Sequence, residues 1–288
     1  MPEGDTVYRQ AVLLRRALAG RILTRSDLRF PSIATADLSG RTVTEVVPRG
    51  KHLLVRTDGG PDGLPPLTLH SHLLMEGMWH VYPRGARWRR PGHQARAVLE
   101  NAAAQAVGFD LGMLDLVATA DEDELVGHLG PDLLGPDWDR AEALARLARH
   151  PLRRVGAALM DQRNLAGIGN VYRNEILFLQ RLHPFTPVAE VPDLGAVVDL
   201  SHRLLHVNRD RSQRSTVGAR PVAASSSGST AAAGSRAAGA GPRSGRRGST
   251  TPSSCPASRT PGRRGTGRCG SASAASPSPP ESGRRGLS

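Results

Sequence analysis

The spacing of apolar residues changes along the chain and divides it into segments. Near the N-terminus, apolar residues recur every three to four positions, the interval of a helix with one buried face. Asp5 or Thr6 is placed to cap this helix and Gly20 to end it. The apolar positions are Val7, Ala11, Leu14 and Leu18. We therefore expect the chain to open with an amphipathic helix.

After Gly20 the interval shortens to two, which indicates strands with one buried face. Gly, Pro and Asp separate these runs and predict turns between them. The predicted strands are Ile22–Phe30, Thr42–Val47, His52–Thr57, Leu67–His72, Trp79–Tyr82 and Ala95–Leu99. Many short strands in series favour an antiparallel sandwich or barrel.

From about Asp121 the helical interval returns, and the acidic run that begins there is typical of a solvated helix start. The predicted helices are a stretch capped by Asp137 that runs to Arg149, then Arg154–Asp161, Ile168–Leu182 and Asp193–Val207. Strands first and helices afterwards predict an α+β fold. We expect an N-terminal β-sandwich domain at residues 1–120 and a helical domain at residues 121–210.

From residue 211 to residue 288 the composition changes to Ser, Gly, Ala, Pro and Arg, with no aromatic residue. Such a segment has too little apolar surface to offset the entropy lost on folding. We expect a disordered, low-complexity tail. Its abrupt start suggests the hypothesis that a GC-rich gene is being translated there in a shifted frame.

Charge follows the same division. The chain has a formal net charge of +12, and residues 211–288, with 13 Arg and the single acid Glu281, account for all of it. Residues 1–210 hold 25 basic and 25 acidic residues. A neutral body attracts a polyanion only through a local arginine patch, because its net charge supplies no long-range field.

The cysteine content and the apolar runs also restrict the cellular compartment and the kinds of metal site that the chain can have. Cys255 and Cys269 are the only cysteines, so residues 1–210 contain neither a disulfide nor a Cys-ligated metal. The N-terminus has no signal-peptide pattern, and no run approaches ~18 apolar residues. We expect a cytoplasmic protein that is not associated with a membrane.

The first residues form a candidate for covalent chemistry. A small residue after the initiator usually allows Met1 to be removed, which would leave the secondary amine of Pro2 at the N-terminus. The pKa of an α-amino group lies near ~8, so this amine is a usable nucleophile for a Schiff base. Glu3 beside it suits a general acid or base. A proline that only blunts the N-terminus is the alternative.

Lys51 is the only lysine among 38 basic residues. Lysine is a compact donor that exchanges protons, whereas arginine stays charged, so a single lysine is a candidate for a role that arginine cannot fill. Codon bias is the competing explanation.

Residues 161–175 predict two helices joined by a tight glycine turn. Gly167 and Gly169 do not belong to a dinucleotide-binding fingerprint, because Tyr172 stands where the third glycine is required. We expect free N–H groups from Gly167 to Asn170 and the Asn170 amide to face an anion at the start of the second helix. An ordinary glycine connection between helices is the alternative.

Together, Pro2-Glu3-Gly4, Arg49-Gly50-Lys51 and the turn from Gln162 to Asn170 resemble the formamidopyrimidine-DNA glycosylase / endonuclease VIII family. The resemblance covers residues 1 to about 210, and the start Met-Pro-Glu-Gly-Asp-Thr-Val is most similar to its actinobacterial endonuclease VIII-like branch. It implies a β-sandwich and a helix-two-turn-helix domain, with damaged DNA between them. The implied activity is a DNA glycosylase and abasic-site lyase that excises oxidised bases and cleaves the strand by β,δ-elimination in base excision repair.

The resemblance also implies roles for individual residues. Pro2 would be the Schiff-base nucleophile, Glu3 the acid or base that helps open the deoxyribose, and Lys51 the cation at the phosphate or the reacting sugar. Asn170, with the turn at Gly167 and Gly169, would bind a backbone phosphate. The stretch Leu74, Met75 and Glu76 would fill the space left by the flipped base, although an acid is unusual there.

Two features depart from the family. Thr6 stands where many members have a second N-terminal carboxylate, so that role stays unassigned. The family's C-terminal zinc finger needs two Cys-x-x-Cys pairs, but Cys255 and Cys269 are single and far apart. The chain therefore has no ligand set for the structural zinc, and the implied chemistry needs no cofactor.

Two alternatives remain. Without the finger, the chain could be a damaged-DNA-binding protein with impaired catalysis. A His-dependent metal hydrolase is the other, but His70 and His72 alternate along one predicted strand without a matching carboxylate. The expected partner is damaged double-stranded or single-stranded DNA, bound by a monomer, and the preferred lesion stays open.

Overall fold

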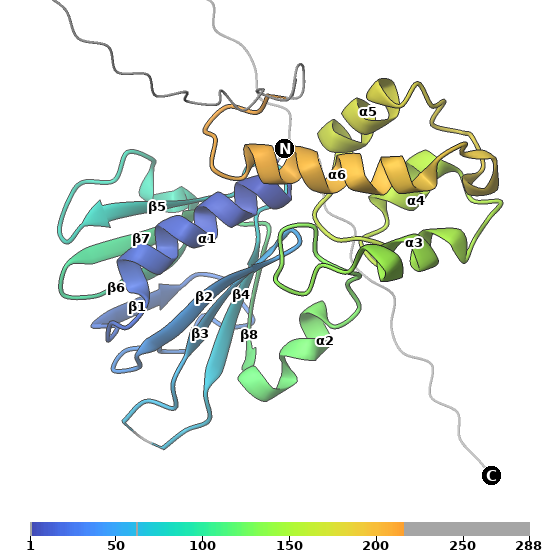
Figure 1. The fold of residues 1–288 in the computed structure, drawn as a ribbon. Helices are drawn as coiled ribbons and strands as arrows, with labels where there is room; N and C mark the ends of the chain where they lie inside the picture. The colour runs from blue at the N-terminus through green and yellow to red at the C-terminus, as the bar shows by residue number, and fades with distance from the viewer. Residues whose placement is uncertain (1, 62, 216–288) are drawn as a thin grey trace, which may run out of the picture. The chain divides into compact units, whose positions relative to one another are not determined.

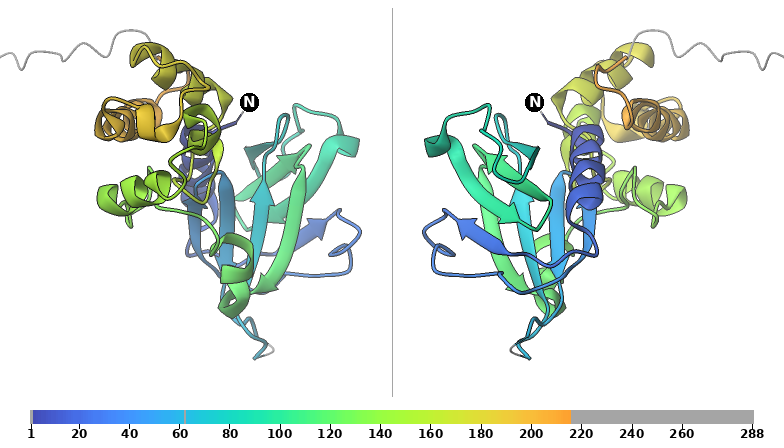
Figure 2. Two further views of the ribbon diagram at one scale, coloured as in Figure 1. Left: turned by 90° about the vertical axis from the view of Figure 1, so that its right-hand side faces the viewer. Right: turned by 90° about the vertical axis from the view of Figure 1, so that its left-hand side faces the viewer.

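The computed structural model describes residues 2–61 and 63–215. It contains eight strands in two antiparallel sheets, with the orders β1-β6-β7-β5 and β2-β3-β4-β8, within the described residues. The strands are β1 (Arg25–Leu28), β2 (Val43–Arg49), β3 (His52–Thr57), β4 (Leu67–His72), β5 (Met78–Pro83), β6 (Ala95–Glu100), β7 (Ala104–Phe109) and β8 (Met113–Ala118). Figures 1 and 2 show the two sheets and the helix α1 that lies along them.

The sheets form a sandwich because each strand contributes one apolar face to a shared core. Every one of the eight strands places a buried residue in this cluster, from Leu28 in β1 to Leu114 in β8. The helix α1 (Gly4–Leu18) adds Val7, Leu14 and Leu18 to it. The predicted β-sandwich with a leading helix is confirmed.

The helices after the sandwich are α2 (Glu122–Val126), α3 (Arg140–Ala148), α4 (Val155–Met160), α5 (Asn170–Leu179) and α6 (Leu194–Asn208). Helices α3 to α6 surround a second core that includes Tyr172, Ile176 and Leu204. Asp193 caps α6 by accepting a hydrogen bond from the Ala196 N–H at 2.8 Å. The predicted α+β class and the predicted helix that opens at Asp193 are confirmed.

Several predicted element boundaries were wrong. The strands β7 and β8 were not predicted, because their short runs of Ala, Gly and mixed residues lack a clear interval of two. Helix α1 begins at Gly4 with Glu3 before it, so neither Asp5 nor Thr6 is its cap. Helix α3 is capped by Asp139, which accepts hydrogen bonds from the N–H groups of Ala141 and Glu142, and not by Asp137.

The predicted tail lies outside the described residues from 216 onward, and so does the prediction that it is disordered. Residues 211–215 are part of the described structure. Ser215 donates its N–H to the side chain of Asn208 at 2.7 Å, and Arg214 bonds to α1. The packed body therefore extends beyond residue 210, where the sequence analysis ended it. The predicted domain boundary near residue 120 stays a prediction.

No helix among the described residues has the length and apolar character needed to cross a membrane.

Candidate active site

The side chain of Glu3 is fully buried at the start of helix α5. Its carboxylate accepts hydrogen bonds from the N–H groups of Gly169 and Val171 at 2.8 Å each and of Tyr172 at 3.3 Å. A helix N-terminus favours an anion because its first N–H groups have no partner within the helix. The anion predicted for this turn is thus supplied by the chain itself, from 166 residues away.

The expectation that the N–H groups from Gly167 to Asn170 face an external anion therefore needs correction. The Gly169 N–H is bonded to Glu3, and the Gly167 N–H donates to the Gln162 side chain at 3.0 Å. Asn170, the first residue of α5, is exposed. Of the predicted phosphate-binding residues Gly167, Gly169 and Asn170, Asn170 is the one that is exposed to solvent.

Glycine is required where the N-terminus meets the turn. A Cβ atom at Gly169 would lie 2.5 Å from the Cδ atom of Glu3, far inside van der Waals contact. The N–H of Gly4 donates to the Gly167 carbonyl at 2.9 Å and ties the backbone of the N-terminal arm to the same turn. The Pro2-Glu3-Gly4 motif and the glycine turn therefore contact each other and form a single site.

Lys51 reaches this turn from the hairpin between β2 and β3. Its Nζ atom donates to the Ile168 carbonyl at 2.9 Å, and Gln162 donates to the same carbonyl at 2.9 Å. Burial lowers the pKa of the Lys51 ammonium, and the nearby charge of Glu3 opposes that shift. The structure thus brings Lys51, Glu3 and the glycine turn together.

The hairpin is held in place by a residue that the sequence analysis missed. Gly50 has a φ of 58°, and its N–H donates to the buried carboxylate of Asp132 at 2.7 Å. Asp132 also accepts the Leu134 N–H at 2.9 Å, and burial raises the pKa of its carboxyl. No local pattern marks Asp132, since its partner lies 82 residues away.

Pro2 lines a cleft of about 590 Å³. The void-filling candidates Met75 and Glu76 line the same cleft and are exposed. Leu74 is not part of this lining, and its side chain lies against Gly112 in the turn before β8. The cleft has three arginines from separate parts of the chain in its wall, Arg9, Arg90 and Arg214.

Asp5 forms a buried ion pair beside Pro2. Its carboxylate is fully buried and accepts two hydrogen bonds from Arg214, at 2.7 and 2.6 Å. Arg9 approaches it at 3.4 Å. Burial by itself would raise the pKa of the Asp5 carboxyl, but the hydrogen bond and charge of Arg214 and the charge of Arg9 outweigh burial and lower it. No local pattern predicts this pair, because Arg214 lies 209 positions along the chain from Asp5.

Replacing Arg214 with alanine is expected to lower the free energy of unfolding by about 3 kcal/mol at neutral pH, because it leaves a buried charge with one distant partner. In the native protein, the lowered pKa makes Asp5 stabilising above pH 3.8, and this contribution is lost as the pH falls through the lowered value. In Arg214→Ala, burial raises the pKa, so stability should instead fall as the pH rises from about 4 to 7. Urea unfolding at several pH values measures this reversal.

Arg9→Ala is the matched control, because Arg9 also faces Asp5 but lies 3.4 Å away and is partly exposed. We expect a loss below about 1 kcal/mol with no reversal of the pH dependence. Equal losses for the two variants would show that Arg214 has no special role.

Three histidines, His52, His70 and His72, form a cluster beside Lys51, and the prediction that His70 lacks a matching carboxylate was wrong. His70 does have a matching carboxylate: its Nδ1 atom lies 3.0 Å from Asp115, on the unpredicted strand β8. His52 bonds to His70 at 2.8 Å and stacks on its ring. Burial, followed by neighbouring imidazoles, lowers the pKa of His52 to about 3, and burial with Lys51 lowers that of His72 to about 4. Both rings are therefore neutral at pH 7.

Among the described residues, no group of three or more His, Cys, Asp or Glu side chains has an arrangement that could hold a metal ion. Cys255 and Cys269 lie outside the described residues. Two single cysteines do not fit a four-cysteine zinc site.

Comparison with known proteins identifies the relatives of the chain. Residues 1–113 match the formamidopyrimidine-DNA glycosylase N-terminal domain, and residues 129–203 match the H2TH domain of formamidopyrimidine-DNA glycosylase. A probable endonuclease 8 2 of Streptomyces coelicolor is 55% identical over 223 residues, which cover 76% of this chain and 79% of the relative. The DNA-(apurinic or apyrimidinic site) lyase Nei2 of Mycolicibacterium smegmatis is 44% identical over 218 residues, which cover 76% and 82%.

Solved structures share the fold. The Lactococcus lactis Fpg (MutM) in complex with DNA that contains N7-benzyl-Fapy-dG superposes with a TM-score of 0.60 at 21% identity, over 72% of this chain and 78% of that one. With two domain models in the expected order and relatives that are similar over most of their length, the chain belongs to the formamidopyrimidine-DNA glycosylase / endonuclease VIII family.

Proposed function

We propose that this protein is a DNA glycosylase and abasic-site lyase of base excision repair that reacts through the amine of Pro2. The observation that carries the proposal is the placement of Glu3. Its carboxylate is fixed by three N–H groups, while the neighbouring Pro2 lines an open cleft with arginines in its wall. The relatives named endonuclease 8 and abasic-site lyase support the same reaction class.

The proposed reaction begins when removal of Met1 frees the secondary amine of Pro2. The nitrogen attacks C1′ of the damaged nucleotide, a C1′–N bond to the protein forms, and the bond from C1′ to the base breaks. The base takes the proton that it needs to leave as a neutral molecule. Opening of the sugar ring then gives an iminium ion, the form of Schiff base that a secondary amine makes.

The iminium ion makes the C2′ protons acidic. Loss of a C2′ proton breaks the C3′–O bond and releases the 3′ phosphate. Loss of the C4′ proton then breaks the C5′–O bond and releases the 5′ phosphate, which completes β,δ-elimination. Water then releases the sugar remnant and restores the Pro2 amine. Glu3 is proposed to exchange protons with the sugar oxygen as the ring opens.

Lys51 is proposed to supply a positive charge at the reacting sugar or its phosphate. An ammonium group has three donors, and one of them is bonded to the Ile168 carbonyl at 2.9 Å. The other two donors are left for a phosphate or a sugar oxygen. The lowered pKa brings the group closer to proton exchange at neutral pH, which a guanidinium does not undergo.

DNA contacts on both sides of the flipped nucleotide complete the proposal. The exposed Asn170 side chain would bind a phosphate at the start of α5, beside the glycine turn. Leu74, Met75 and Glu76 would fill the space left by the flipped base, with Met75 and Glu76 entering from the cleft wall. Filling the vacated space offsets the few kcal/mol that base flipping costs. We further propose that a cytoplasmic monomer acts on damaged double-stranded or single-stranded DNA.

Borohydride reduction tests the proposal directly. The full chain is mixed with duplex DNA that contains an abasic site, sodium borohydride is added, and the reduced complex is digested and mapped by mass spectrometry. We expect a covalent adduct on the peptide that begins with Pro2, and the same yield in the presence of EDTA. Binding of the duplex without any adduct would overturn the lyase and leave a damaged-DNA-binding protein.

A further inference from the structure

An arginine-rich loop joins strand β5 to the short 3₁₀ helix η1 (Gly92–Gln94) before β6. Within seven positions, the loop carries four arginines and no acid: Arg84, Arg87, Arg89 and Arg90. Residues 85–92, with Gln105 of β7, line a pocket of about 640 Å³. We call residues 84–92 the arginine loop.

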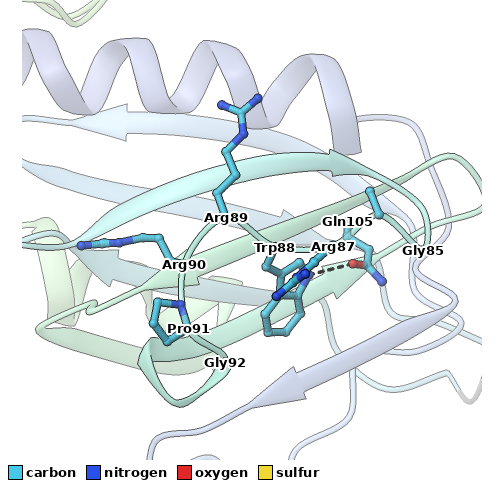
Figure 3. A pocket seen from close by; sticks show the side chains of 9 residues that line it. Gly85, Arg87, Trp88, Arg89, Arg90, Pro91, Gly92 and Gln105 are labelled. Carbon is cyan, nitrogen blue, oxygen red and sulfur yellow. Dashed lines mark hydrogen bonds between the residues drawn. The ribbon is translucent and has the colours of Figure 1, made fainter. Parts of the chain in front are cut away.

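Two of these arginines have acidic partners and two do not. Arg84 pairs with Glu100 at 2.9 Å and Arg90 with Asp110 at 3.3 Å. Arg87 and Arg89 are exposed, and their guanidinium groups form no ion pair with any residue in the described ranges 2–61 and 63–215. In Figure 3 the side chain of Arg89 extends away from the pocket floor formed by Trp88 and Gln105.

The backbone of the loop is held in place although its cations are unpaired. The Arg89 N–H donates to the Tyr82 hydroxyl at 3.2 Å, and the Trp88 indole N–H donates to Gln105 at 3.0 Å. Trp88 packs edge-on against Phe109. A fixed loop that presents unpaired guanidinium groups loses little conformational entropy when it binds an anion.

The loop continues the wall of the Pro2 cleft. Arg90 lines both the loop pocket and the cleft that contains Pro2, Met75 and Glu76. A DNA strand leaving the cleft past Arg90 would meet Arg87 and Arg89 next. Residues 1–210 are electrically balanced overall, so binding of DNA needs a local concentration of cations of this kind.

We propose that the arginine loop is a DNA-backbone site, in which Arg87 and Arg89 bind phosphates of the substrate strand outside the lesion pocket. This inference rests on the proposed function and adds a contact surface to it. Guanidinium groups bind phosphate oxygens in a bidentate way, and such contacts set position and affinity without reading the sequence.

The test is the salt dependence of DNA binding by the double variant Arg87→Ala/Arg89→Ala. Binding of the full-length protein to a duplex with a tetrahydrofuran abasic analogue is measured from low to high salt. Each phosphate contact contributes about 0.9 to the slope of log affinity against log salt, so we expect the slope to fall by about 1.8. Affinity at low salt should fall at least about tenfold.

Arg16→Ala/Arg21→Ala is the matched control. It removes the same charge from exposed arginines at and beyond the opposite end of α1 from Pro2. We expect this variant to keep the native slope, and Arg87→Lys/Arg89→Lys to keep most of it. An unchanged slope in the loop variant, or equal losses in the loop and control variants, would overturn the proposal.

The binding assay and the borohydride assay separate this inference from the proposed function. If the native protein forms no adduct, the proposed lyase activity is ruled out. The slope of log affinity against log salt still tests whether the arginine loop binds DNA phosphates. If the loop variant forms the adduct at the native yield when protein saturates the DNA, with a reduced slope, both proposals stand.

Discussion

Blocking the amine of Pro2 is expected to abolish both the borohydride-trapped adduct and strand cleavage, by a factor of at least about 10³. The sharpest way is to insert a leucine between Met1 and Pro2. A large residue after the initiator keeps Met1 in place, so the proline nitrogen becomes part of an amide. An amide nitrogen has no available lone pair and cannot attack C1′, whereas the side chains of Pro2, Glu3 and the cleft remain.

Binding is the control for this variant. Because Pro2 only lines the cleft, affinity for the tetrahydrofuran duplex should stay within about threefold of the native value. The blocked variant keeps two other amines that can form a Schiff base, the α-amine of the retained Met1 and the side chain of Lys51, the single lysine, and peptide mapping distinguishes an adduct on either one. A full-yield adduct with Met1 still attached would rule out the proposed nucleophile.

The sequence predicted the elements whose packing is periodic. A regular spacing of apolar residues predicts helix α1, six of the eight described strands and helix α6. A polar residue at the start, Asp193, also marks the beginning of α6. Strands β7 and β8 were not predicted, because β7 buries four consecutive residues and β8 has one fully buried residue, so neither shows an interval of two. The missing strand β8 also concealed the pairing of His70 with Asp115.

The residue types that carry the chemistry of the site could be predicted from the sequence, but the contacts between them could not. The turn from Gly167 to Asn170 predicts an anion, and Glu3 is an anion, yet no local rule joins residues that lie 166 positions apart. The same limit applies to Asp132 under Gly50, and to Asp5 with Arg214. Each is a long-range contact between a buried carboxylate and groups that only the fold brings together.

The second large effect is expected from Glu3→Gln, which keeps the shape of the side chain and removes its charge. Glu3 accepts three N–H bonds through two oxygens, Oε2 from Gly169 and Tyr172 and Oε1 from Val171. In either orientation of the amide, an NH₂ group would face at least one of these donors. We expect the free energy of unfolding to fall by about 2 kcal/mol, through the unsatisfied donor and the lost interaction with the α5 N-terminus.

Catalysis should fall further than this structural cost explains. Removing a general acid or base typically slows a reaction by about 10²–10⁴-fold, and we expect a loss in that range in the single-turnover rate of strand cleavage. Asp193→Asn is the matched control, because it makes the same carboxylate-to-amide change at the start of α6, where the side chain is exposed. That variant should cleave at the native rate.

Temperature separates the two roles of Glu3. If the carboxylate only anchored the N-terminal arm to α5, the Glu3→Gln protein would regain the native rate at a temperature where circular dichroism shows it fully folded. A proton-transfer role predicts that the rate deficit persists there, because the missing group acts on the sugar and not on the fold. Recovery to within threefold of the native rate would reduce Glu3 to a structural residue, and the proton transfer at ring opening would then need another group.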